Sequence, residues 1–187
     1  HFQRRFIGIF RMRVDGNATA VVSDIDRAVG HQRKLDAAGM AGVTEALAAA
    51  GIRVLPSDRA YVESAYLDNP SRIACTLAED ASGRILGFQW LGHAIAGNAY
   101  GTPEGWGVIG THVAPDAPRQ GIGRGLFAKT RAAIAAACLP QVEACIGAAN
   151  APALAYYGAM GFKDWRAGEG PNGPLSVKIY PGMAQAD

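Results

Sequence analysis

A glycine-rich segment between an expected strand and an expected helix constrains this chain more than any other feature. Residues 113–126 read VAPDAPRQGIGRGL, and Pro115 and Pro118 end the strand because proline cannot continue a strand ladder. Three alternating glycines then lead into an amphipathic stretch: Gly121, Gly123 and Gly125. Glycine permits a tight turn and the close approach of an anion, and the first helical turn has up to four unpaired N–H groups. The segment therefore predicts a helix N-terminus that binds a pyrophosphate.

Two well-known phosphate-binding turns differ from this one in their spacing. A Walker loop ends in Gly-Lys-Ser/Thr, whereas Gly125 is followed by Leu126. A dinucleotide-binding turn has the spacing GxGxxG, and Leu126 stands at its third glycine. Glu143 follows about 20 residues later, as an acidic ribose ligand should, but it comes early in its expected strand. An NAD(P)-binding oxidoreductase is therefore the weaker interpretation.

The first third of the chain predicts helices. Apolar residues recur at helical spacing over residues 24–50, with Ser23 as the N-cap. A break in the spacing around Gly39 predicts two helices rather than one. A further short helix is expected after Asp58, and it should end before Pro70.

The rest of the chain alternates between strands and helices. Strands are expected at 72–77, 84–93, 106–113, 141–147, 163–167 and 175–180, and helices at 123–138 and 152–160. The polar, Gly-containing connection between the first two strands is typical of a hairpin. This order predicts a mixed α/β sheet in a single domain over residues 1–187.

A second motif lies one helix and one strand after the glycine-rich turn. Residues 150–162 read NAPALAYYGAMGF, and the turn itself reads QGIGRG over residues 120–125. With these two motifs the chain resembles the GNAT superfamily of acyl-CoA-dependent N-acyltransferases, over about residues 70–180. The stretch 105–126 is also similar to the phosphinothricin-type branch. The resemblance implies a mostly antiparallel central sheet flanked by helices, with splayed strands that form an acyl-CoA cleft.

The resemblance also implies that acetyl-CoA is the cosubstrate and that the backbone near the turn holds it. The amide of Val113 would bind the thioester carbonyl, and Asn150 would bond to the pantetheine. The turn residues that would hold the pyrophosphate are Gln120, Gly121, Ile122, Gly123, Arg124 and Gly125. The structural alternatives are an ordinary tight turn, a solvated Arg124 and a helix N-cap at Asn150.

Tyr157 is the residue expected to protonate the departing thiolate. A phenol near pKa 10 and a thiol near 8.5 differ by about 1.5 units, or about 2 kcal/mol. The alternative is that Tyr157 is a core aromatic residue. Glu104 and His112 are the candidates for the base that deprotonates the amine, and a bound water is the third possibility. Strand alternation could aim His112 away from the thioester.

Composition excludes several other classes of function. The 18 basic and 16 acidic residues leave a net charge of +2, which is too small for nucleic-acid binding. No stretch approaches the ~20 apolar residues of a membrane helix. The three cysteines are Cys75, Cys138 and Cys145. They form no CxxC pair and lie in apolar segments, which predicts buried free thiols and a cytoplasmic protein. The four histidines show no metal-ligand spacing, so no metal is expected.

The predicted function is transfer of an acetyl group to a primary amine of a small molecule or peptide, by direct attack in a ternary complex. The sequence does not specify the acceptor. Dimerisation is common in the superfamily, so a homodimer is a further possibility. The main alternative is a module that binds acyl-CoA without catalysis.

Overall fold

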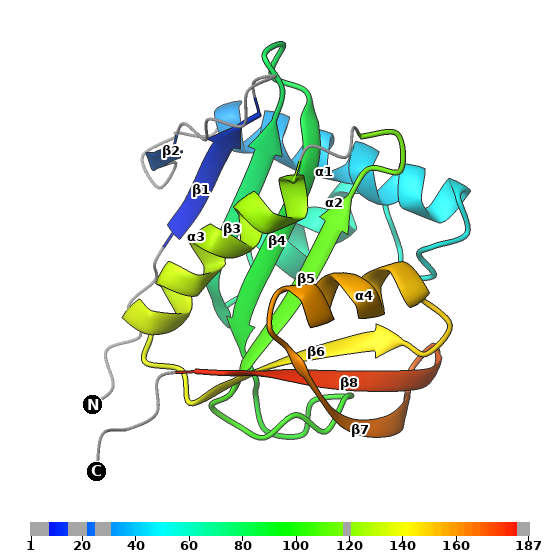
Figure 1. The fold of residues 1–187 in the computed structure, drawn as a ribbon. Coiled ribbons are helices and arrows are strands. Elements are labelled where there is room, and N and C mark those ends of the chain that lie inside the picture. Colours follow the sequence, from blue (N-terminus) through cyan, green and yellow to red (C-terminus); the bar gives the residue numbers. More distant parts are fainter. Residues whose placement is uncertain (1–7, 15–21, 25–30, 118–120, 183–187) are drawn as a thin grey trace.

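The strands of this protein form a single twisted sheet with helices on both faces (Figure 1). The computed structural model describes residues 8–14, 22–24, 31–117 and 121–182. The strands are β1 (Gly8–Arg13), β2 (Val22–Asp24), β3 (Arg72–Glu79), β4 (Ile85–His93), β5 (Gly107–Val113), β6 (Gln141–Gly147), β7 (Lys163–Gly170) and β8 (Gly173–Pro181). Their order across the sheet is β2-β1-β3-β4-β5-β6-β8-β7. The pairs β1/β3 and β5/β6 are parallel and the others antiparallel, which confirms the predicted mixed, mostly antiparallel sheet.

The helices divide between the two faces. One face, called here the α1 face, is covered by α1 (His31–Ala49), α2 (Arg59–Val62) and the short π-helical turn η1 (Glu63–Leu67). The other, the α3 face, is covered by α3 (Ile122–Ala136) and α4 (Ala151–Ala159). Side chains alternate between the faces along each central strand, so Phe88 packs in the core of the α1 face and Leu91 in that of the α3 face.

The central strands β5 and β6 separate soon after they meet. They pair at Gly107 with Val142 and at Val108 with Glu143, and the described residues show no pairing beyond these two positions. The other edge of β5 stays paired with β4 as far as Val113. The predicted splay is thus present, and it leaves the second half of β5 without a strand on its β6 side.

Most predicted elements begin and end within three residues of the observed ones, from β3 to β8. The short helix after Asp58 is also present as α2 and η1, and the Asp58 side chain accepts a hydrogen bond from the Tyr61 amide at its start. The N-terminal predictions are less accurate. Ser23 lies in strand β2 and is no helix cap, and strand β1 was not predicted from the sequence.

The predicted break of the long helix at Gly39 is wrong, because α1 is continuous through that residue. A Cβ atom at Gly39 would lie 2.5 Å from Cγ1 of Ile85, so this glycine lets the helix approach strand β4 closely. The buried stripe is continued by Ala37 and Ala41 beside Met40. Small residues therefore complete the buried face of α1, and a search for large apolar side chains does not detect them.

The cysteines only partly match expectation. Cys75 is buried, Cys145 is partly buried and Cys138 is exposed, so the prediction of a buried thiol is wrong for Cys138. In the part of the chain that the structure describes, no helix combines the length and the hydropathy needed to span a bilayer.

Candidate active site

The glycine-rich turn forms the N-terminus of α3. Gly121 is the N-cap residue and has φ +73°, a left-handed conformation that residues with a Cβ atom rarely adopt. The first intrahelical bond runs from the Gly125 amide to the Gly121 carbonyl. The amides of Ile122, Gly123 and Arg124 therefore belong to the first turn, where N–H groups lack acceptors within the helix. Such a turn is able to bind a pyrophosphate.

Two of the three glycines also have a packing reason that the sequence did not indicate. A Cβ atom at Gly123 would lie 2.6 Å from the ring of Tyr156. One at Gly125 would lie 2.5 Å from Sδ of Met12. These glycines therefore let α3 approach α4 and β1, and they are needed whether or not a phosphate binds.

The side chains near the turn differ in what they can offer a ligand. Ile122 is buried, so only its backbone faces the turn, whereas Arg124 is exposed on the first turn of α3. Gln120 lies outside the described residues. The side-chain oxygen Oδ1 of Asn150 accepts a hydrogen bond from the Ala153 amide, so Asn150 caps α4. Its NH₂ group is the part that remains to bond with a pantetheine.

The backbone of β5 is oriented to receive an extended ligand. The Ala114 amide donates to the Leu86 carbonyl, and Val113 stands opposite Gly87 in the β4–β5 register. Since only alternate residues of an antiparallel pair bond across it, the N–H groups of Val113 and Thr111 point away from β4 and toward the splay. The predicted role of the Val113 amide is therefore compatible with its direction.

Tyr157 reaches from α4 across the splay to β5. Its ring is buried and packs against Phe162, with 4.9 Å between the ring centroids. Its hydroxyl lies 2.9 Å from the Thr111 hydroxyl. Burial raises the pKa of Tyr157, so the phenol is protonated at neutral pH and is a weaker acid than a free tyrosine. Tyr157 is thus a core residue whose hydroxyl lies beside the Thr111 side chain, in the half of β5 that no longer pairs with β6.

His112, the next residue after Thr111, points to the opposite face of the sheet. Its Nε2 lies 3.2 Å from the Tyr66 hydroxyl, and its ring centroid is 4.6 Å from that of Phe88. Burial lowers the pKa of His112 to about 3, so the ring is neutral at pH 7. The structure does not bring His112 together with Tyr157.

Glu104 is exposed in the loop before β5. It stands in a β-turn, in which the Trp106 amide donates to the Pro103 carbonyl and Gly105 has φ +84°. Strand β5 begins after this turn, at Gly107, and the four steps from Gly107 to Thr111 span about 13 Å. Glu104 therefore lies before β5, at the other end of the strand from Val113.

The acidic residue considered for a dinucleotide site has a different environment from the one a ribose would need. Glu143 is fully buried, and its Oε1 accepts a hydrogen bond of 2.5 Å from Nη2 of Arg166. The Cys145 thiol lies 3.4 Å from the same oxygen, and burial together with this carboxylate raises the pKa of Cys145 to about 12. A carboxylate enclosed in this way is not presented to a ribose hydroxyl.

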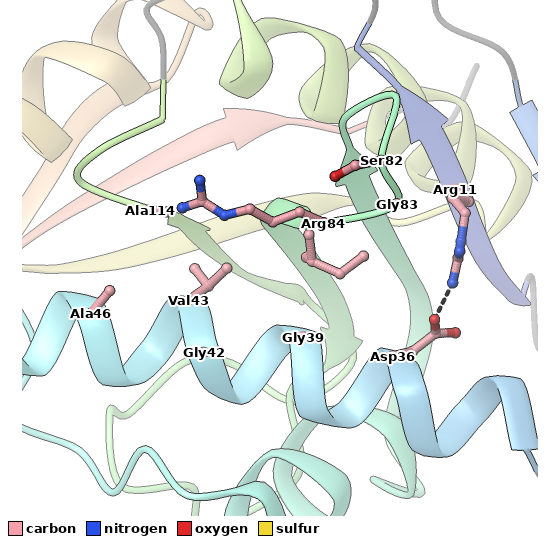
Figure 2. Close-up of a pocket in the computed structure, with 11 residues that line it drawn as sticks. Arg11, Asp36, Gly39, Gly42, Val43, Ala46, Ser82, Gly83, Arg84 and Ala114 are labelled. Atoms are coloured by element: carbon pink, nitrogen blue, oxygen red, sulfur yellow. Dashed lines mark hydrogen bonds and ion pairs between the residues drawn. The ribbon is translucent and has the colours of Figure 1, made fainter.

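A cavity of about 560 Å³ lies elsewhere, between α1 and the β3–β4 turn (Figure 2). Its polar walls include the ion pair of Arg11 with Asp36, and Arg84 extends over it from the turn. Arg84 also pairs with Asp116. Tyr157 and Thr111 do not line this cavity, so it is separate from the splay.

Comparison with known families identifies a large part of the chain. Residues 43–162 match the model of the acetyltransferase (GNAT) family. A mycothiol acetyltransferase from Clavibacter michiganensis subsp. michiganensis is 41% identical over 88 residues. That match covers 47% of this chain and 26% of the relative, so the chain spans about a quarter of the length of the curated protein.

Solved structures show the same fold at low sequence identity. A GCN5-related N-acetyltransferase from Kribbella flavida superposes with a TM-score of 0.65 at 18% identity, covering 79% of this chain and 92% of that one. A phosphinothricin acetyltransferase from Sinorhizobium meliloti, solved in complex with acetyl-CoA, gives 0.61 at 20% identity, covering 80% and 88%.

Proposed function

Since this chain belongs to the acetyltransferase (GNAT) family, we propose that it transfers an acetyl group from acetyl-CoA to a primary amine by direct attack in a ternary complex. The observation that carries the proposal is the open edge of β5. There the backbone of Thr111 and Val113 faces the splay, and the Tyr157 hydroxyl lies beside the Thr111 side chain of the same strand.

The residues present suit acetyl-CoA as a substrate. The amides at the start of α3, together with Arg124, would hold the pyrophosphate. The pantetheine would lie along the unpaired edge of β5 as an additional strand, with Asn150 donating to it. The Val113 amide would then stabilise the negative charge that develops on the thioester oxygen.

The amine must be neutral to attack, and we propose a water molecule as its base. An alkylammonium has a pKa near 10.4, whereas that of His112 is lowered to about 3. Proton transfer between them would cost about 10 kcal/mol. Glu104, in the turn before β5, lies at the far end of that strand from Val113 and is not placed to take this proton. The nitrogen attacks the thioester carbon, the C–S bond breaks, and Tyr157 protonates the sulfur.

We further propose that the acceptor is a small molecule or peptide amine and that the protein works in the cytoplasm. The relatives named mycothiol acetyltransferases support acetyl transfer, and their acceptor belongs among the amines to be tested. The buried free thiol of Cys75 suits a reducing compartment.

Two measurements test the proposal. Thermal melting with acetyl-CoA, CoA or NADPH should show stabilisation by the first two alone. Release of free CoA should then be followed across a panel of primary amines, and at least one amine should accelerate it. Stabilisation by NADPH without stabilisation by CoA would refute the proposal. Stabilisation by CoA with no active amine would instead favour the non-catalytic binding module.

A further inference from the structure

Three side chains connect the Gly123 carbonyl of the glycine-rich turn to the Tyr157 hydroxyl: Tyr156, Gln89 and Thr111, and the series is called here the Gln89 relay. The Tyr156 hydroxyl donates to the Gly123 carbonyl at 2.8 Å. Nε2 of Gln89 donates to the Tyr156 hydroxyl at 3.1 Å and to the Thr111 hydroxyl at 2.7 Å. The Thr111 hydroxyl lies 2.9 Å from that of Tyr157. Strand β4, strand β5 and helices α3 and α4 all contribute to the relay.

The first bond of the relay fixes the direction of all the others. A tyrosine hydroxyl has one proton, and that of Tyr156 is used on Gly123. The Tyr156 oxygen can therefore only accept from Gln89, which requires the NH₂ end of the Gln89 amide to face it. The second N–H of the same group then points to Thr111, whose oxygen accepts it. Thr111 keeps its own proton to donate to Tyr157.

The burial of Gln89 makes this orientation specific. Its side chain is only 1% exposed, and its Oε1 has no hydrogen-bond partner within the described ranges. If the amide were reversed, Oε1 would face the hydroxyls of Tyr156 and Thr111 and would accept hydrogen bonds from both. The Tyr156 hydroxyl would then no longer donate its one proton to the Gly123 carbonyl. The turn at Gly123 thus decides which end of Gln89 faces Thr111.

We propose that Gln89 and Thr111 are positioning residues for the reaction proposed above: by donating along the relay, they leave the Tyr157 proton free for the departing thiolate. The inference rests on the proposed function. When the C–S bond breaks, the proton moves from the Tyr157 oxygen to the sulfur. The phenolate that remains accepts the hydrogen bond from Thr111, and it regains a proton that the attacking amine has released to water.

The groups that surround Tyr157 agree with this assignment. The titratable neighbours are Tyr156 on α4 and Cys145 on β6, and burial raises the pKa of both, so both are neutral at pH 7. Burial also raises the pKa of Tyr157, and the Thr111 hydroxyl lowers it. Thr111 therefore opposes the loss of acidity that burial imposes on Tyr157.

The kinetic test replaces the hydroxyl of Thr111 and leaves its shape. Thr111→Val should lower kcat roughly 10- to 100-fold and change the KM for acetyl-CoA by less than about twofold. Thr111→Ser, which restores the hydroxyl, should return kcat to within about threefold of wild type. Gln89→Glu should lower kcat similarly, because a carboxylate only accepts and reverses the relay. Thr130→Val is the matched control, since Thr130 is a buried threonine whose hydroxyl bonds to the Leu126 carbonyl.

A double-mutant cycle separates positioning from a general structural role. In a Tyr157→Phe background, Thr111→Val should cause no further loss of kcat, because Thr111 acts through the missing phenol. Equal losses in the two backgrounds, or a Thr111→Ser variant as slow as Thr111→Val, would overturn the inference.

A readout that needs no acceptor keeps the inference testable if no amine is found. The ¹³C resonance of the Tyr157 ring Cζ, assigned through its loss in Tyr157→Phe, should shift in Thr111→Val and in Gln89→Glu and stay in place in Thr130→Val. An unchanged resonance in the first two variants would refute the relay. The proposed function fails separately, if CoA and acetyl-CoA do not stabilise the wild-type protein.

Discussion

Thr111 and His112 are consecutive residues of β5, yet they lie in different chemical environments. Thr111 faces the α3 side, where its hydroxyl joins Gln89 to Tyr157. His112 faces the α1 side, where Tyr66 and Phe88 enclose its ring. The difference shows that strand alternation decides which environment a residue of β5 meets, whatever its chemical type. Threonine, which no motif singled out, contacts the expected acid, whereas histidine belongs to an aromatic core.

The largest expected effect tests this contrast directly. Tyr157→Phe should lower kcat by about 100-fold or more with little change in acetyl-CoA affinity, because it removes the proton donor on the α3 side. His112→Phe should change kcat by less than about threefold. CoA release by the two variants, measured with one active amine, is the comparison. If His112→Phe lowered kcat as much as Tyr157→Phe does, His112 would have to take part in the reaction.

The two glycines of the turn extend the comparison to packing. Gly123→Ala should lower the free energy of unfolding by about 1–3 kcal/mol, because the new methyl group meets the rigid ring of Tyr156. Gly125→Ala should cost less, since it meets the flexible thioether of Met12 and gains helix propensity. Urea unfolding of both variants measures the difference. Equal stabilities would show that the Tyr156 ring moves aside easily.

The decrease in the free energy of unfolding at acidic pH should depend on His112. Its pKa is about 3 in the folded protein against about 6.5 when unfolded, so the unfolded state binds the proton more readily between these values. The contribution of His112 to stability is therefore complete above pH 6.5 and is lost as the pH falls toward 3. At pH 5 the loss should be about 2 kcal/mol. Chemical unfolding from pH 4.5 to 7.5 should show this slope in wild type and a shallower one in His112→Phe.

The sequence predicts the structure of the glycine-rich turn better than that of the N-terminal region. The turn was predictable because glycine and proline act locally, and its position between β5 and α3 is as expected. Strand β1 was missed although residues 10–14 alternate between apolar and charged side chains, because this pattern is only five residues long and the pairing of β1 with β3 joins residues far apart in the chain. Gly39 was misread because the reason for it, the contact with Ile85, is tertiary. Sequence patterns thus identify local backbone requirements, and distant contacts decide the rest.

The same distinction applies to the candidate site. Tyr157 was identified through a motif, whereas Thr111 and Gln89 have no characteristic spacing and become visible only when β4, β5 and α4 meet. Tyr156 is adjacent to Tyr157 in the same motif, and its position there predicts no role of its own. Its bond to the Gly123 carbonyl gives it a distinct place beside the turn.

A smaller effect is expected at the exposed arginine of the turn. Arg124→Gln should weaken CoA binding by several-fold at low salt, because the side chain lies on the first turn of α3 where a phosphate would bind. The effect should shrink as salt screens the interaction. Arg131→Gln is the matched control, since Arg131 is also exposed on α3 but lies two turns further along. Calorimetric titration with CoA at two salt concentrations measures both, and equal affinities of the two variants would leave Arg124 a solvated side chain.

The smallest effect is expected at Glu104, the other base considered from the sequence. Its exposed carboxylate lies in the turn before β5, and the strand from Gly107 to Thr111 alone spans about 13 Å. At this distance a surface charge is largely screened at physiological salt, and no proton passes directly to it. Glu104→Gln should therefore leave kcat within about twofold of wild type across pH 6–9. A loss of tenfold or more that grows toward low pH would mean that the β4–β5 loop folds over the splay when substrates bind. Residues at both ends of β5 would then contribute to the reaction, and the contrast between its two faces would not be enough to explain activity.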